Sequence, residues 1–222
     1  MDQTVNKTGT QTGDQKLNPL VAYLTSQFAR PRGPLGVMAG RIMSQRGSNV
    51  DRNFWMLDLL GFQPDDRVLE IGPGPGVALA AVAERVTLGE LVAIDHSPIM
   101  LRQTAKRTAE AVAQGRVTLI EGDAGLLPAN LGRFDRIYAM NVWQFWDDQE
   151  AVIDSLTQRL NVGGKLALGY QPRHRGATAA DADAGRRCLV DQFAAGGLSD
   201  VADHMLDLEP PVTCVIGARS AG

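Results

Sequence analysis

The feature that most constrains the fold is a glycine-rich stretch between an apolar segment and a helical pattern. Val68, Leu69 and Ile71 form a short apolar run that is typical of a buried strand. It leads directly into Gly72-Pro73-Gly74-Pro75-Gly76. From 79 to 86, apolar residues recur at the spacing of one helix face. The sequence therefore predicts a strand that turns into a helix through a glycine loop.

The spacing of the glycines limits the kinds of ligand that such a loop could bind. Glycine accepts a positive φ, and a helix start offers unpaired N–H groups to an anion. A dinucleotide fingerprint needs a third glycine at the sixth position, where this chain has Val77. The prolines also remove two N–H donors. A smaller anion such as an amino-acid carboxylate is favoured, and a nearby acid, Glu70, supports a ligand over a plain turn.

Length, charge and cysteine content argue against several classes of protein. The chain has 222 residues and a net charge of −3, without a clustered basic tract, which favours one α/β domain and argues against a nucleic-acid surface. The sequence contains no apolar run of about 18 residues, so no membrane-spanning helix is expected. Cys188 and Cys214 have no CxxC partner, which favours reduced thiols and a cytoplasmic protein. The histidines, His96, His174 and His204, lack metal-ligand spacing.

The chain divides into three parts by composition. Residues 1–16 are polar and predict a disordered tail. Residues 17–62 carry three helical patterns, the last of which is expected to be capped by Ser48 or Asn49 and to end near Gly61. This helical section either packs on the sheet or folds over a ligand as a lid through Met38 and Met43. Residues 63–222 form the expected sheet domain.

Three further strands are expected to end in polar residues. The apolar run 91–94 ends in Asp95, about 20 residues beyond the glycine loop, where a nucleoside-binding unit places a carboxylate for the ribose. Strand 117–120 leads to Asp123 and strand 134–140 to Asn141. Alternatively, Asp95 is only an acidic residue at the start of the next helix, where its charge interacts favourably with the helix dipole.

The helix after Asp95 is expected to begin at Ser97 and to reach Gly115. Its expected buried face consists of Leu101, Ala105, Thr108 and Val112.

These residues together resemble a class I S-adenosylmethionine-dependent methyltransferase. The resemblance covers about Val68 to Arg219 and rests on Glu70-x-Gly72-x-Gly74-x-Gly76, Asp95, Gly122-Asp123-Ala124 and Gly163-Gly164 in that order. It implies a Rossmann-like, seven-stranded, mostly parallel sheet with helices on both faces, preceded by an N-terminal helical extension or lid. The last strand would be antiparallel to the others.

The resemblance also implies a cofactor site for S-adenosylmethionine, with S-adenosylhomocysteine as the product. The glycine loop would hold the methionine portion, Asp95 the ribose and Asp123 the adenine amino group, with His96 and Ala124 beside the adenosine. The full expected set is Glu70, Gly72, Pro73, Gly74, Gly76, Asp95, His96, Met100, Asp123, Ala124 and Asn141.

The acceptor side is expected after strands four and five. Aromatic residues at 143, 145 and 146 follow strand four, and each is either core or pocket. The expected acceptor-lining set is Met38, Met43, Trp143, Trp146 and Tyr170. Asn141 is not followed by the Pro-Pro-aromatic signature of enzymes that methylate nucleic-acid bases, which disfavours base flipping.

The C-terminal part offers two further candidates. Asp147 and Glu150 predict the start of a helix in preference to a metal site. His174, in a basic loop after strand 165–170, is either a general base or a solvated histidine. A helix over 182–195 and strands at 205–208 and 212–218, joined by Pro210-Pro211, complete the expected sheet.

The expected function is methyl transfer to a small molecule, with oxygen slightly favoured over nitrogen or carbon. A base is needed only where the acceptor must lose a proton. A non-catalytic nucleoside-binding protein is one alternative. A nicotinamide-dependent oxidoreductase is another, although no Tyr-x-x-x-Lys set is present. Exchange of the N-terminal helical section makes a homodimer a candidate assembly.

Overall fold

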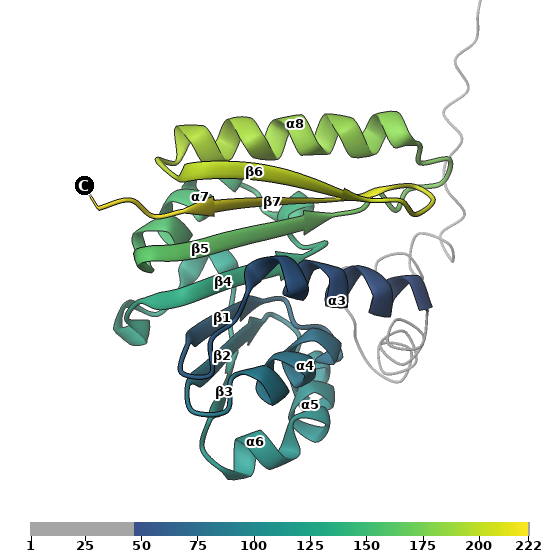
Figure 1. Ribbon diagram of the computed structural model, residues 1–222. Helices are drawn as coiled ribbons and strands as arrows, with labels where there is room; N and C mark the ends of the chain where they lie inside the picture. Colours follow the sequence, from purple (N-terminus) through teal and green to yellow (C-terminus); the bar gives the residue numbers. More distant parts are fainter. Residues whose placement is uncertain (1–46, 222) are drawn as a thin grey trace, which may run out of the picture.

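The computed structural model describes residues 47–221 as one seven-stranded sheet with helices on both faces. The strand order is β3-β2-β1-β4-β5-β7-β6, which can be followed from bottom to top in Figure 1. The strands are β1 (Arg67–Ile71), β2 (Glu90–Asp95), β3 (Val117–Glu121), β4 (Phe134–Met140), β5 (Leu160–Tyr170), β6 (Ser199–Leu206) and β7 (Val212–Ala218). Strands β1 to β5 are parallel, and β7 is antiparallel to both β5 and β6. The expected seven-stranded, mostly parallel fold is confirmed.

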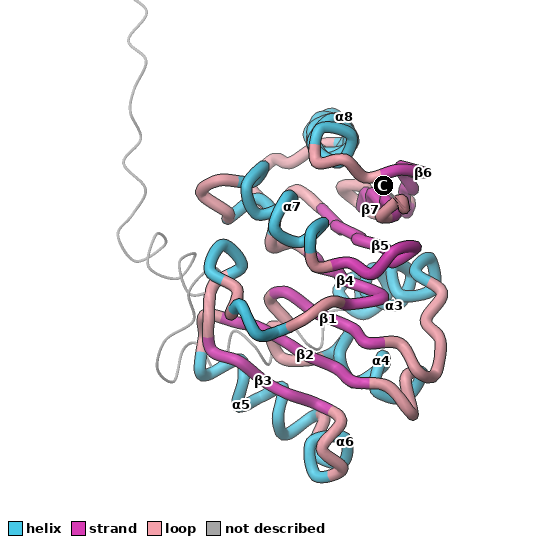
Figure 2. The backbone as a smooth tube through the Cα atoms, turned by 90° about the vertical axis from the view of Figure 1, so that its left-hand side faces the viewer, coloured by secondary structure: helices cyan, strands magenta, loops and turns pink. Residues whose placement is uncertain are grey.

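Two hydrophobic cores lie on the two faces of the sheet. Strand residues alternate between them because successive side chains of a strand point to opposite faces. Leu69 of β1 joins the core that contains α7 (Gln149–Gln158) and α8 (Ala179–Ala195). Its neighbour Val68 joins the core formed with α3 (Gly47–Leu60), α4 (Val77–Arg85) and α6 (Ala109–Ala113). Figure 2 shows the sheet between these layers.

Helix α3 confirms the third helical pattern of the N-terminal section but corrects its start. It begins at Gly47, so Ser48 and Asn49 lie inside the helix and do not cap it. Residues 1–46, which include the expected tail and the first two helical patterns, lie outside the described residues. In the part of the chain described, no helix is long and apolar enough to span a bilayer.

The segment after β2 also differs from the expected single helix. Ser97 is the N-cap of α5 (Pro98–Arg107), and its side chain accepts from the Met100 N–H, as expected. The helix then breaks at Thr108, and α6 follows. The buried residues are Met100, Thr104, Thr108 and Ala111. Of the expected face only Thr108 is buried, because the true face lies one position before Leu101, Ala105 and Val112.

Three boundaries differ near the C-terminal half of the sheet. The expected turn at 161–164 lies inside β5, where the pairing with β4 shifts register and Gly163 has φ +77°. Strand β6 begins at Ser199 and ends at Leu206, earlier than expected. Helix α7 is capped by Asp148, which accepts from the Ala151 N–H, and not by Asp147.

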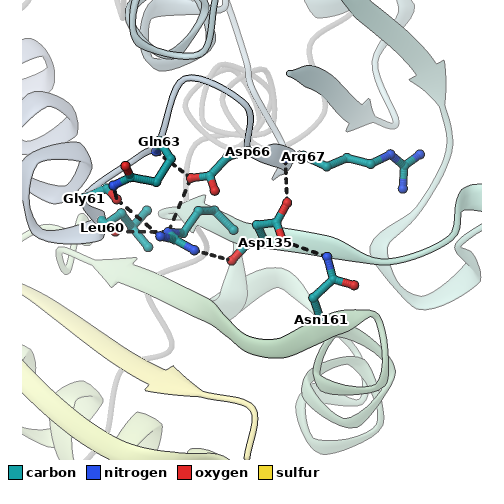
Figure 3. A network of polar contacts seen from close by, with 8 residues as sticks. Leu60, Gly61, Gln63, Asp66, Arg67, Asp135 and Asn161 are labelled. Atoms are coloured by element: carbon teal, nitrogen blue, oxygen red, sulfur yellow. Dashed lines mark hydrogen bonds and ion pairs between the residues drawn. The ribbon is translucent and has the colours of Figure 1, made fainter. Parts of the chain in front are cut away.

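A polar network at the amino ends of the strands, opposite the site described below, joins α3 to the sheet (Figure 3). The Arg136 guanidinium donates to the carbonyls of Leu60 and Gly61 and lies 3.6 Å from the Asp66 carboxylate. Asp135 accepts from the Arg67 N–H and from the Asn161 amide. This network fixes the end of α3 relative to β4.

Candidate functional site

A cavity of about 510 Å³ opens at the carboxyl ends of the parallel strands. Such edges are where open α/β sheets bind ligands, and the volume is in the range of ligand sites. Ten of the eleven residues expected to bind a cofactor line it, namely Glu70, Gly72, Pro73, Gly74, Asp95, His96, Met100, Asp123, Ala124 and Asn141. The fold therefore brings together residues that are scattered over 72 positions of the sequence, from 70 to 141.

The glycine loop has the positive φ angles that its glycines permit. Gly72, Gly74 and Gly76 all have positive φ, at 67°, 53° and 77°. A Cβ on Gly72 would lie 2.6 Å from the Val142 side chain. A Cβ on Gly74 would meet no atom within 4 Å, because this residue faces open space. The loop thus presents bare backbone to the cavity.

Gly76 is the exception among the expected cofactor residues, because it does not line the cavity. It is the N-cap of α4, and a Cβ there would lie 2.8 Å from Thr104 Cα. The Thr104 hydroxyl also donates to the Gly74 carbonyl at 2.8 Å. The third glycine therefore permits close packing of α5 against the loop.

Asp95 is buried at the end of β2 and ties that strand to the glycine loop. Its carboxylate accepts from the Ser97 N–H at 2.8 Å and from the Gly74 N–H at 3.2 Å. Burial raises the pKa of the Asp95 carboxyl, and the hydrogen bond from the Ser97 N–H opposes the rise. His96 lies beside it, with 3.8 Å between Nδ1 and Oδ1. The carboxylate lines the cavity while it orders the loop.

Glu70 is a buried carboxyl that pairs with a tyrosine which sequence reasoning missed. The Tyr138 hydroxyl donates to Glu70 Oε2 at 2.9 Å, and both residues are buried. Burial raises the pKa of Glu70 to about 8, and the Tyr138 hydrogen bond acts in the opposite direction. The two residues are register partners on β1 and β4, which only the strand pairing reveals.

The end of β4 is linked to β5 and α3. Asn141 has φ +57°, and its side-chain oxygen accepts from the Gln171 N–H at 2.6 Å. The Gln171 side chain accepts from Arg52 at 2.8 Å. Arg52 and Asn53 line the cavity from α3. The sequence did not identify Arg52 and Asn53 as site residues, because the helical pattern in this segment indicates only which apolar residues face the core.

The aromatic residues after β4 divide between core and cavity. Trp143 is 6% exposed, and its indole N–H donates to the Gln192 amide at 2.8 Å. Its ring packs edge-on against Tyr170 at 5.5 Å. Neither of these two residues lines the cavity, which corrects the expected acceptor set, whereas Phe145 and Trp146 do line it.

The remaining candidates lie elsewhere. His174 is an exposed side chain whose Nε2 is 3.6 Å from the Asp181 carboxylate, and it does not line the cavity. Met38 and Met43 lie outside the described residues. Among the side chains at 50–221, no group of three or more His, Cys, Asp or Glu residues is placed to hold a metal ion.

Comparisons with known proteins show which family the chain resembles. A family model described as a methyltransferase domain matches residues 68–164. An uncharacterised methyltransferase of Bacillus subtilis, YdaC, is 29% identical over 183 residues, which are 82% of this chain and 98% of the relative. A rice chloroplast 2-methyl-6-phytyl-1,4-hydroquinone methyltransferase is 31% identical over 46% of this chain and 28% of its own.

A solved structure with the same fold covers most of both chains. It is the N-methyltransferase NodS from Bradyrhizobium japonicum in complex with S-adenosylhomocysteine. The TM-score is 0.67 at 16% identity, over 90% of this chain and 98% of that one.

Proposed function

Because the chain belongs to the class I S-adenosylmethionine-dependent methyltransferases, we propose that its acceptor is a small molecule bound at the β4 and β5 side of the cavity. Transfer to oxygen is slightly favoured over transfer to nitrogen or carbon. The observation that carries the proposal is that cofactor-type residues and the aromatic side chains of Phe145 and Trp146 line the same cavity. A cytoplasmic location, as expected from the sequence, belongs to the same proposal.

The residues present fit the cofactor. The glycine loop offers bare backbone where a Cβ on Gly74 would point into open space. Asp95 and Asp123 line the cavity at the ends of neighbouring strands, where two hydrogen-bonding ends of a nucleoside would be held. We infer that the loop holds the methionine end, Asp95 the ribose and Asp123 the adenine.

The cofactor supplies a methyl group on a positively charged sulfur, and the protein supplies position and a dry site. Holding two reactants in line accounts for much of the barrier reduction in such a transfer. Phe145 and Trp146 line the cavity and would cover a bound acceptor. The carboxyl of Glu70 keeps its proton near neutral pH because its pKa is about 8. His174 is not among the residues that line the cavity and lies beside Asp181, so we assign it no proton transfer.

A turnover screen tests the proposal. The full chain is incubated with S-adenosylmethionine and a panel of phenols, alcohols and amines, and S-adenosylhomocysteine release and product mass are measured. We expect release with at least one small acceptor, and with phenols before amines. Release only with a protein or nucleic-acid acceptor, or none with any acceptor, would refute it. Calorimetry with S-adenosylhomocysteine controls for an intact cofactor site.

A further inference from the structure

The charged groups of the cavity are separated by sign. Two aspartates, Asp95 and Asp123, line it at or just beyond the ends of β2 and β3, and the protonated carboxyl of Glu70 lines it from β1. Arg52 lines it from α3 and is 6% exposed. Among the described residues of the cavity wall, Arg52 is the sole lysine or arginine. The cavity therefore has an acidic side and a cationic side.

A buried amide holds the guanidinium on the cationic side. Arg52 Nη1 donates to Gln171 Oε1 at 2.8 Å. Gln171 is 1% exposed, and its side-chain N–H donates to the Pro210 carbonyl at 2.7 Å. Its backbone N–H donates to Asn141 Oδ1 at 2.6 Å. Because the amide is held at both ends, it fixes the direction of the guanidinium.

This arrangement lies on the acceptor side of the sheet. Gln171 directly follows β5, which is separated from β1 by β4. Neighbouring strands are about 4.8 Å apart, so the Gln171 strand and the glycine-loop strand are roughly 10 Å apart. The N–H groups of Gly72, Gly74 and Gly76 are donated within the protein, but the first turn of α4 lines the cavity through Val77 and Ala78. The N–H groups of a first helical turn have no partner within the helix and suit a methionine carboxylate. The guanidinium is thus placed for a different anion.

The chemistry of arginine defines that anion. A guanidinium is planar, stays charged and carries five donors that match a carboxylate with two parallel hydrogen bonds. One guanidinium balances one negative charge, which suits a carboxylate better than a dianionic phosphate ester. A negative group at this end would also orient the acceptor, because the acidic side of the cavity repels it.

Resting on the function proposed above, we propose that the methyl acceptor carries a carboxylate, which Arg52, held by Gln171, recognises. Arg52 is then a residue that determines specificity and acts on the acceptor, not on the cofactor. The acceptor class becomes small hydroxylated or amino acids with a free carboxylate.

Matched acid and amide pairs test this inference. The probes are 4-hydroxybenzoate, 3,4-dihydroxybenzoate and anthranilate, each with its carboxamide. Binding to the full chain saturated with S-adenosylhomocysteine is measured by ligand-observed NMR, and turnover with S-adenosylmethionine is measured in parallel. We expect the acids to be preferred by about tenfold or more, as for a charge-assisted hydrogen bond.

Variants locate the source of the preference. Arg52→Gln should reduce the ratio of acid to amide towards one, and Arg52→Lys should retain part of it, with the dissociation constant for S-adenosylhomocysteine unchanged. Arg187→Gln is the matched control, because Arg187 is an exposed residue of α8 that pairs with Asp183 away from the cavity. It should leave the ratio unchanged.

Several results would overturn the inference. Equal binding of acids and amides, or no binding of either, would overturn the inference. If the protein still bound S-adenosylhomocysteine and methylated neutral acceptors, the proposed function would be unaffected. A weaker affinity of Arg52→Gln for S-adenosylhomocysteine with an unchanged acid preference would assign the guanidinium to the cofactor's carboxylate. Absence of turnover with all acceptors, charged or neutral, would instead count against the proposed function.

Discussion

At the scale of single residues, the site depends on two buried carboxyls that do different work. Asp95 engages two backbone N–H groups, at Ser97 and Gly74, so it orders the loop that the ligand would contact. Glu70 engages a phenol hydroxyl in a fully desolvated position. The first is stabilised by backbone donors, and the second is held by one side-chain donor and has its pKa raised mainly by burial. Substitutions at the two positions therefore have different readouts.

Asp95→Ala should weaken the affinity for S-adenosylhomocysteine by one to two orders of magnitude, since a lost charge-assisted hydrogen bond costs about 1.5 to 3 kcal/mol. Calorimetry measures the dissociation constant. Asp95→Asn is the control for loop geometry, because its amide oxygen still accepts from the Ser97 N–H. An unchanged dissociation constant in the alanine variant would contradict the ribose role.

Glu70→Gln should change how stability depends on pH. The folded pKa of about 8 lies above the ordinary value of 4.5, so the folded state holds this proton more tightly than the unfolded state. This contribution to stability is complete below about 4.5 and is lost as the pH rises through about 8. The glutamine variant carries no such proton and can still accept from Tyr138.

Denaturant unfolding at a series of pH values between about 5 and 8 tests this effect. The wild-type free energy of unfolding should decline over that range more steeply than that of Glu70→Gln. Asp95, whose pKa is also raised, contributes in the same direction in both proteins, so the difference between the slopes reports Glu70 together with its interaction with Asp95. Equal slopes would show that Glu70 does not hold its proton in the folded state.

At the scale of elements, local sequence patterns predicted most helices and strands, but the exact residues at which they end depend on the segments that pack or pair with them. The pattern 134–140 matches β4 to the residue. The turn read at Gly163-Gly164 became a bulge within β5, because Gly163 and Gly164 also bond to Arg219 beyond the end of β7. Pairing with a distant segment overrode the local signal.

The cap of α7 gives a prediction at this scale. Asp148→Ala should lower the free energy of unfolding by about 0.5 to 2 kcal/mol, because Asp148 accepts from the Ala151 N–H at 3.0 Å. Asp147→Ala is the matched control and should change stability by less than about 0.5 kcal/mol, as for an ordinary surface position. Denaturant unfolding measures both. A larger effect at Asp147 would restore it as the cap.

At the scale of the whole molecule, the two edges of the sheet have different tasks. The carboxyl edge carries the cavity, whereas the amino edge carries the Arg136 network that joins α3 to β4 (Figure 3). Helix α3 spans both, since it contributes Arg52 to the cavity and its last carbonyl to that network. Helix α3 is thus fixed at its C-terminal end and lines the cavity through Arg52 and Asn53.

Arg136→Met should destabilise the fold without a direct effect on the site. Loss of its hydrogen bonds to Leu60 and Gly61, and of the contact with Asp66, should cost about 1 to 3 kcal/mol of unfolding free energy. Denaturant unfolding measures the loss, and calorimetry should show an unchanged affinity for S-adenosylhomocysteine. Arg107→Met, at an exposed position of α5, is the control with little expected change. A large loss of affinity would show that the two edges are coupled.

The sequence by itself determined the order of the elements, the glycine loop and the acids that follow the strands, because each is written in local spacing and turn chemistry. Parallel strands bring their ends to one edge, so Glu70, Asp95 and Asp123 were expected together before any contact was known. Only the tertiary structure decided that Tyr138 reaches Glu70, that Trp143 is core, and that Arg52 meets Gln171 across 119 residues. Those contacts depend on register and packing between distant segments, which local patterns do not encode.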